Sequence, residues 1–213
     1  GRVTYSSNTR LDQVYRFPET QMVYQRGANG ITNIDYRRQL GEAFTPGTKF
    51  YDNIDNFFRT GTSTTHNLSF EAGTETTSYR LSLSNLKQEG VTPNTSYDRL
   101  TASLNATAKI SPKFKSEGTF NFTKSENDKA SKGGSGGLTG SNGYLLTLLG
   151  WPQNDDVRNY LNADGTRRKI TTGALDTETD NPFWDVEKNL STDWNNRFVT
   201  NVGIFGCPII SSR

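Results

Sequence analysis

The residues that could perform hydrolytic chemistry in this 213-residue chain are few and scattered. A glycine-rich run from Gly133 to Gly137 has the G-x-S-x-G spacing of a hydrolase nucleophile elbow, centred on Ser135. That motif works only on a sharp strand-to-helix turn beside an oxyanion hole, whereas a Gly/Ser run is typical of a flexible loop. The general base would have to be His66, the only histidine in the sequence. We therefore expect no catalytic residues and a protein that is not an enzyme.

Metal and redox chemistry is equally poorly supported by the sequence. Asp155, Asp156, Asn162 and Asp164 could offer oxygen ligands to calcium, but they form no complete loop signature, so ordinary turn chemistry is favoured. The single cysteine, Cys207, excludes an intrachain disulfide and a cysteine-rich zinc site. We predict no metal and no cofactor.

Composition narrows the class of protein further. Hydrophobic residues make up only 31% of the chain while aromatic residues reach 11%, which a disordered chain would not retain. The net charge of +2 and the lack of a basic block give no case for a nucleic-acid partner. No run of 18 apolar residues could cross a bilayer as a helix, so a membrane crossing would have to use strands.

Apolar and polar residues alternate with period two in several long stretches. The clearest runs from Leu100 to Lys109, where Leu and Ala alternate with Thr, Ser and Asn. Such alternation predicts strands with one apolar and one polar face. We expect six strands, at roughly residues 2–11, 62–73, 77–88, 97–110, 114–127 and 195–205.

Strand length and loop asymmetry favour a membrane barrel over a soluble sandwich. The alternating runs approach about ten residues, whereas strands of globular proteins cluster at about five or six and membrane strands need about 9–11. Connections at 73–76 and 111–113 are tight, while long loops are expected at roughly 18–58 and 128–193. Outer-membrane barrels have short periplasmic turns and long outer loops. The fold predicted is all-β, a partial antiparallel transmembrane β-barrel.

Aromatic residues near the expected strand ends are candidates for the girdles that anchor a barrel at both membrane interfaces. Strand propensity alone would also place aromatics in these positions. The candidates are Tyr5, Tyr79, Tyr97, Phe114 and Trp194.

Ordered sequence motifs resemble one known family. The motifs are NFFRTG at 56–61, SYRLSLSN at 78–85, QEGVTPN at 88–94, RLTASLN at 99–105 and NPFW at 181–184. In their residues and in their order along the chain, these motifs resemble the first barrel strands of the SusC/RagA family of TonB-linked outer-membrane transporters of Bacteroidetes. The likeness covers most of residues 1–205.

The resemblance implies a barrel of about 22 strands with a plugged lumen, located in the outer membrane. Residues 1–205 would be the N-terminal part of that barrel, residues 206–213 an atypical tail, and the plug domain would be absent from this chain. The partners implied are a SusD-like surface lipoprotein and the TonB-ExbB-ExbD system, engaged through the missing N-terminal part. The implied activity is import of oligosaccharides or similar bulky nutrients, or alternatively of peptides.

Two groups of residues are the candidate functional sites in this interpretation. The first would line the substrate path on the polar face of the strands: Arg80, Thr101, Ser103, Asn105 and Asn121. The second, in the long loop, would contact a glycan or the lipoprotein partner: Trp151, Phe183 and Trp184. Packing within the loop is the alternative role for these three aromatics.

Two other classes of protein remain open at this point. A secreted soluble β-sandwich binding module or adhesin would also have Asn/Thr-rich alternating strands, but its apolar face would be covered by protein. A barrel enzyme such as an outer-membrane lipase or protease would need a Ser-His-acid set on the strands. A single histidine makes that set hard to assemble.

Overall fold

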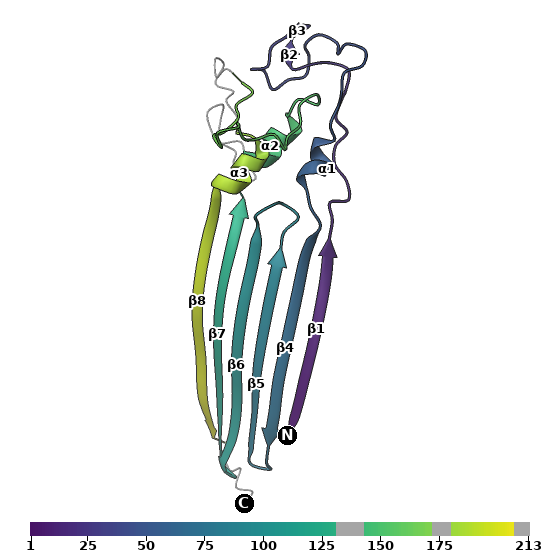
Figure 1. Ribbon diagram of the computed structural model, residues 1–213. Helices are drawn as coiled ribbons and strands as arrows, with labels where there is room; N and C mark the ends of the chain where they lie inside the picture. The colour runs from purple at the N-terminus through teal and green to yellow at the C-terminus, as the bar shows by residue number, and fades with distance from the viewer. Residues whose placement is uncertain (131–142, 172–179, 207–213) are drawn as a thin grey trace, which may run out of the picture.

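A computed structural model describes residues 1–130, 143–171 and 180–206 (Figure 1). The glycine-rich run at 133–137 lies outside the described residues. The predicted atypical tail lies outside them too, apart from Gly206.

Six antiparallel strands form one sheet in the order β1-β4-β5-β6-β7-β8, so each strand pairs with the next long strand along the chain. Their positions lie close to the predicted ranges. The strands are β1 (Arg2–Asp12), β4 (Gly61–Gly73), β5 (Thr77–Glu89), β6 (Ser96–Ser111), β7 (Phe114–Ala130) and β8 (Leu190–Gly206). Within the described residues β1 and β8 do not pair with each other, so the sheet is open.

The register of the sheet is continuous across all six strands. Its only irregularity is between Lys109 and Ser111, next to the β6–β7 turn. Residues directly opposite one another in an antiparallel pair point to the same face. Leu104 of β6, for example, lies opposite Leu81 of β5 and Phe120 of β7. The alternation in each strand therefore adds up to one apolar and one polar face of the whole sheet.

β7 and β8 are longer than the sequence pattern indicated. Predicted to end at 127 and to begin at 195, they continue to Ala130 and from Leu190, and they pair along their full length. In the outer part of β7, Lys124, Glu126 and Asp128 take the positions that Phe120 and Phe122 hold lower in the strand. Backbone hydrogen bonds continue where the hydrophobic alternation has stopped, so periodicity alone missed the ends.

The short and the long connections lie at opposite ends of the sheet (Figure 1). At one end the backbone N–H of Thr74 donates to the carbonyl of Thr77 at 2.7 Å and closes the β4–β5 turn. At the other end are the two long loops, which contain β2 (Gly27–Ala28), β3 (Ile31–Thr32), α1 (Asn53–Phe57), α2 (Gly143–Leu149) and α3 (Pro182–Lys188). The apolar segment at 144–149 lies in α2.

None of the helices in the described part of the chain is long and apolar enough to cross a membrane.

The buried hydrophobic residues lie in the loops and not on the sheet. They form a cluster, here called the loop core, in which Phe57 stacks on Tyr144 with ring centroids 5.3 Å apart. The members of the loop core are Phe57, Tyr144, Leu148, Trp151, Val157 and Val186. Segments from both long loops are thus joined into one unit at the end of the sheet.

Two buried asparagines fasten this unit by hydrogen bonds to backbone. The Asn53 amide donates to the carbonyl of Asp155 at 3.0 Å and accepts from the Val157 N–H at 3.0 Å. Asn181 caps α3 by accepting from the Phe183 N–H at 2.8 Å, and it donates to the Val157 carbonyl at 2.7 Å. Since buried polar groups require partners, these residues fix the path of the intervening chain.

Replacing Trp151 by alanine should destabilise the loop core by about 3–5 kcal/mol, because the buried ring leaves a large cavity. We expect faster cleavage by trypsin after Arg158, Arg167 and Arg168 in the full-length protein in detergent. Trp194→Ala is the matched control, because the Trp194 side chain is exposed on β8. Equal cleavage rates in the two variants would contradict the prediction.

Candidate functional site

The five residues predicted to line a path lie on the polar face of three adjacent strands. Arg80 of β5 is directly opposite Asn105 of β6, and in the next row Ser103 is opposite Asn121 of β7. Thr101 follows one row further toward the loops. The structure therefore brings all five onto one face, within three consecutive rows. Whether they contact a substrate remains a prediction.

Charged groups on this face are partly paired with each other. The Arg80 guanidinium Nε lies 3.2 Å from the Glu71 carboxylate, and the Thr119 hydroxyl donates to the Asn105 side-chain oxygen at 3.1 Å. Arg2 of β1 is on the other side of Glu71 in the same row. Two arginines thus flank one glutamate, which leaves this row with an excess of positive charge among the described residues.

The opposite face of the sheet is apolar and is exposed over most of its area. Exposed fractions of its large side chains range from 37% at Leu104 to 70% at Val202. The residues are Val3, Tyr5, Leu68, Phe70, Tyr79, Leu81, Leu83, Leu100, Leu104, Phe120, Phe122, Phe198, Val202 and Ile204. No described element covers this face, and an uncovered apolar surface of such extent marks an interaction with a membrane or another protein.

The apolar face has a defined height. On β6 it extends from Leu100 to Ala108, which at about 3.4 Å per residue is about 27 Å along the strand. With the tilt usual in barrels, of about 40°, this corresponds to about 21 Å across a membrane, close to the apolar band of about 25 Å in outer-membrane barrels. On the side toward the loops the same face turns charged, with Lys87, Asp98, Lys124 and Glu126. The apolar band therefore ends at a charged border on three strands, β5, β6 and β7.

The three loop aromatics occupy different environments. Trp151 is only 2% exposed, and its indole N–H donates to Asp155 at 3.1 Å, which favours the packing alternative for this residue. Phe183 is half-buried against Phe57, with ring centroids 5.0 Å apart. Trp184 is half-buried beneath the Lys188 ammonium, 5.6 Å from its ring centroid. Contact of any of them with a glycan or a lipoprotein is untested.

Ion pairs and hydrogen bonds around the loop core shift several pKa values. Hydrogen bonds from Arg158 lower the pKa of Asp156 below its usual value. The pKa of Glu187 is lowered chiefly by Lys188 and also by the Tyr160 hydroxyl, which donates at 2.7 Å. These hydrogen bonds and ion pairs stabilise the ionised carboxylates of Asp156 and Glu187. No group of three or more metal-ligating His, Cys, Asp or Glu side chains occurs in the part of the chain that the structure describes.

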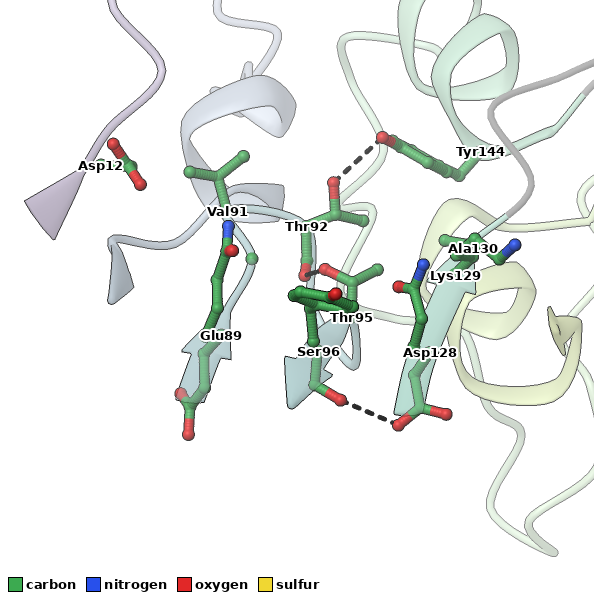
Figure 2. A pocket seen from close by; sticks show the side chains of 14 residues that line it. Asp12, Glu89, Val91, Thr92, Thr95, Ser96, Asp128, Lys129, Ala130 and Tyr144 are labelled. Atoms are coloured by element: carbon green, nitrogen blue, oxygen red, sulfur yellow. Dashed lines mark hydrogen bonds between the residues drawn. The ribbon is translucent and has the colours of Figure 1, made fainter. Parts of the chain in front are cut away.

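A cavity of about 590 Å³ lies where the sheet meets the loops (Figure 2). It is bounded by Asp12 at the end of β1, the β5–β6 connection, the outer end of β7, and Tyr144 of α2. The Thr92 and Tyr144 hydroxyls are hydrogen bonded at 3.0 Å, and the Ser96 hydroxyl donates to Asp128 at 2.9 Å. The first bond fastens the rim of the cavity to the loop core, and the second joins β6 to β7.

Three polar side chains that line this cavity are not among the candidate site residues expected from the sequence. Gln88, Tyr97 and Asn127 line it from the polar face of the sheet, in one cross-strand row. Tyr97 is one of the girdle candidates, but its side chain shares the polar face of Thr101 and Ser103, which favours the alternative of strand propensity for this residue. The odd-numbered alternation of β6 was the signal that could have identified it.

Comparison with known proteins identifies relatives of much greater length. The sequence is 28% identical over 148 residues to the TonB-dependent receptor P3 of Formosa agariphila, which covers 70% of this chain and 14% of that protein. The fold is similar to the RagAB peptide transporter, with a TM-score of 0.56 and 18% sequence identity over 76% of this chain and 18% of that one. No protein-family model matches the chain. The matched part of the chain covers less than a fifth of the length of either relative.

These relationships agree with the geometry of the sheet. TonB-dependent receptors reside in the bacterial outer membrane and are not enzymes, in accordance with the location and the lack of catalysis predicted above. The sequence similarity to a TonB-dependent receptor and the fold similarity to RagAB agree with the resemblance to the SusC/RagA family noted in the sequence.

Proposed function

We propose that this segment forms part of the wall of a TonB-dependent barrel that imports oligosaccharides or similar bulky nutrients across the outer membrane. The observation that carries the proposal is the sheet itself. One face is apolar, uncovered and about as tall as a membrane, while the other is polar. A closed barrel of such strands would place the polar face around its lumen.

The path through the lumen would run along β5, β6 and β7. Its wall there carries Arg80, Thr101, Ser103, Asn105 and Asn121. Hydroxyl, amide and guanidinium groups exchange hydrogen bonds with a hydrated solute and can replace the water that it sheds. A peptide is the alternative substrate, since the structurally similar RagAB is a peptide transporter.

The partners of the whole protein follow from the same proposal. A SusD-like surface lipoprotein would sit over the long loops, where the half-buried Trp184 is a candidate contact. The TonB-ExbB-ExbD system would supply the energy through parts of the protein that lie outside this chain. The length of the relatives leaves ample sequence for those parts.

The soluble β-sandwich considered earlier fits the structure less well. In a sandwich a second sheet covers the apolar face. The described residues form one long-stranded sheet and leave that face bare, while their hydrophobic core lies in the loops.

Placing a charge on the apolar face should prevent insertion of the barrel. Leu104→Lys, near the middle of the apolar band, should destabilise the membrane-inserted full-length protein by about 2–4 kcal/mol, whereas Ser103→Lys on the polar face should cost much less. The folded fraction in outer-membrane preparations can be measured by semi-native gel electrophoresis. Equal folded fractions for the two variants would exclude the assignment of the faces.

Deleting the gene for the full-length receptor should abolish growth on the nutrient that induces its expression, with growth on glucose unchanged. Loss of TonB should have the same effect, because outer-membrane import depends on energy supplied from the inner membrane. Radiolabelled uptake of that nutrient into whole cells checks both results. Undiminished uptake in either strain would refute the proposed function.

A further inference from the structure

We propose that Gln88, Tyr97 and Asn127, here called the Tyr97 row, form a binding subsite for a neutral sugar ring of the imported substrate. This inference rests on the proposed transport function and deepens it. It assigns a ligand chemistry to the cavity of Figure 2.

The geometry places two carboxamides on either side of one aromatic ring. Gln88 of β5 lies directly opposite Tyr97, and Asn127 of β7 lies directly opposite it on the other side. Facing pairs in an antiparallel sheet have Cβ atoms about 4.5–5.5 Å apart. The three side chains are half-buried and line the same cavity, so one small ring can reach all of them.

The polar groups of the Tyr97 row are free to bind a ligand. Other groups of the cavity are already occupied, since Thr92 is bonded to Tyr144, and Asp128 accepts from Ser96. No side-chain hydrogen bond joins any member of the Tyr97 row to another described residue. These two amides and the phenol can donate and accept hydrogen bonds. Because they are already partly shielded from water in the free protein, binding a ligand adds little further desolvation cost.

The chemistry of these groups fits a neutral sugar. The edge of a pyranose ring carries hydroxyls that both donate and accept, which match the two carboxamides, and its C–H face packs on an aromatic ring. Asp12, Glu89 and Asp128 line the same cavity, while its one cation, Lys129, is paired with Asp193. Anionic ligands are therefore disfavoured. The backbone of a peptide could use the carboxamides but has no ring face for Tyr97.

The position of the Tyr97 row suits an entry subsite. It lies on the same face of β6 as Thr101, Ser103 and Asn105, at the end next to the loops. From Tyr97 to Asn105 the strand advances about 27 Å. A sugar bound at the Tyr97 row would thus stand at the start of the polar path, above the apolar band.

The test measures binding to the full-length receptor in detergent by isothermal titration calorimetry. The probes are maltohexaose, cellohexaose, laminarihexaose and mannohexaose, with an acetylated and amidated Ser/Gly hexapeptide for comparison. At least one hexasaccharide should bind, and Tyr97→Ala should weaken it about tenfold or more through loss of the ring face. Gln88→Ala and Asn127→Ala should each weaken it about two- to tenfold, the loss of a hydrogen bond.

Matched variants separate the subsite from general effects. Tyr97→Phe keeps the ring and should cost less than threefold. Gln88→Ala and Asn127→Ala carry the test if Tyr97→Ala fails to fold. Asp98→Ala changes the adjacent residue on the opposite face and should leave affinity unchanged. Failure of every hexasaccharide to bind, or unchanged sugar affinity in the Gln88→Ala, Asn127→Ala and Tyr97→Ala variants, overturns the subsite. Energised uptake could still be observed then, so the two proposals can fail separately.

Discussion

The continuous register of the six-stranded ladder is the constraint on which the rest of this structure depends. Backbone groups in a hydrocarbon layer must be satisfied internally, and strands achieve this only by pairing with their neighbours. Because the side-chain period of a strand is two, a slip of one residue anywhere would exchange the faces. In-phase pairing from β1 to β8 instead carries one apolar and one polar surface across the whole sheet.

The same ladder explains why the hydrophobic core of the chain lies in its loops. The apolar face of the sheet contacts lipid in the proposed barrel and needs no protein cover, so its side chains contribute no packed interior. The loops are hydrated and must bury their own aromatic residues to hold a shape. The loop core and the hydrogen bonds from Asn53 and Asn181 to the backbone of Val157 give the loops a fixed structure.

Sequence reasoning predicted the parts of the structure that depend on local periodicity. The alternation fixes which of Thr101 to Asn105 share a face, and pairing then aligns Arg80 and Asn121 with them. Sequence reasoning did not predict features that depend on contacts between residues distant in the chain. The burial of Trp151 depends on α1, far away in the chain. The outer ends of β7 and β8 carry no hydrophobic alternation, so the pattern could not predict them. Tyr97 was considered for a girdle because it is aromatic, although its odd-numbered position in β6 places it on the polar face.

These outer strand ends connect the membrane wall to the cavity. Above the apolar band the strands of the proposed barrel no longer face lipid, so both faces of the sheet can carry polar side chains. Backbone pairing continues there and keeps the strands in register. The bond between Thr92 and Tyr144 then ties the β5–β6 connection to α2 and so to the loop core. Gln88, Tyr97 and Asn127 are consequently placed by paired strands and not by a loop alone. A site held by strands keeps its geometry better than one held by loops, which favours this row as the proposed binding subsite.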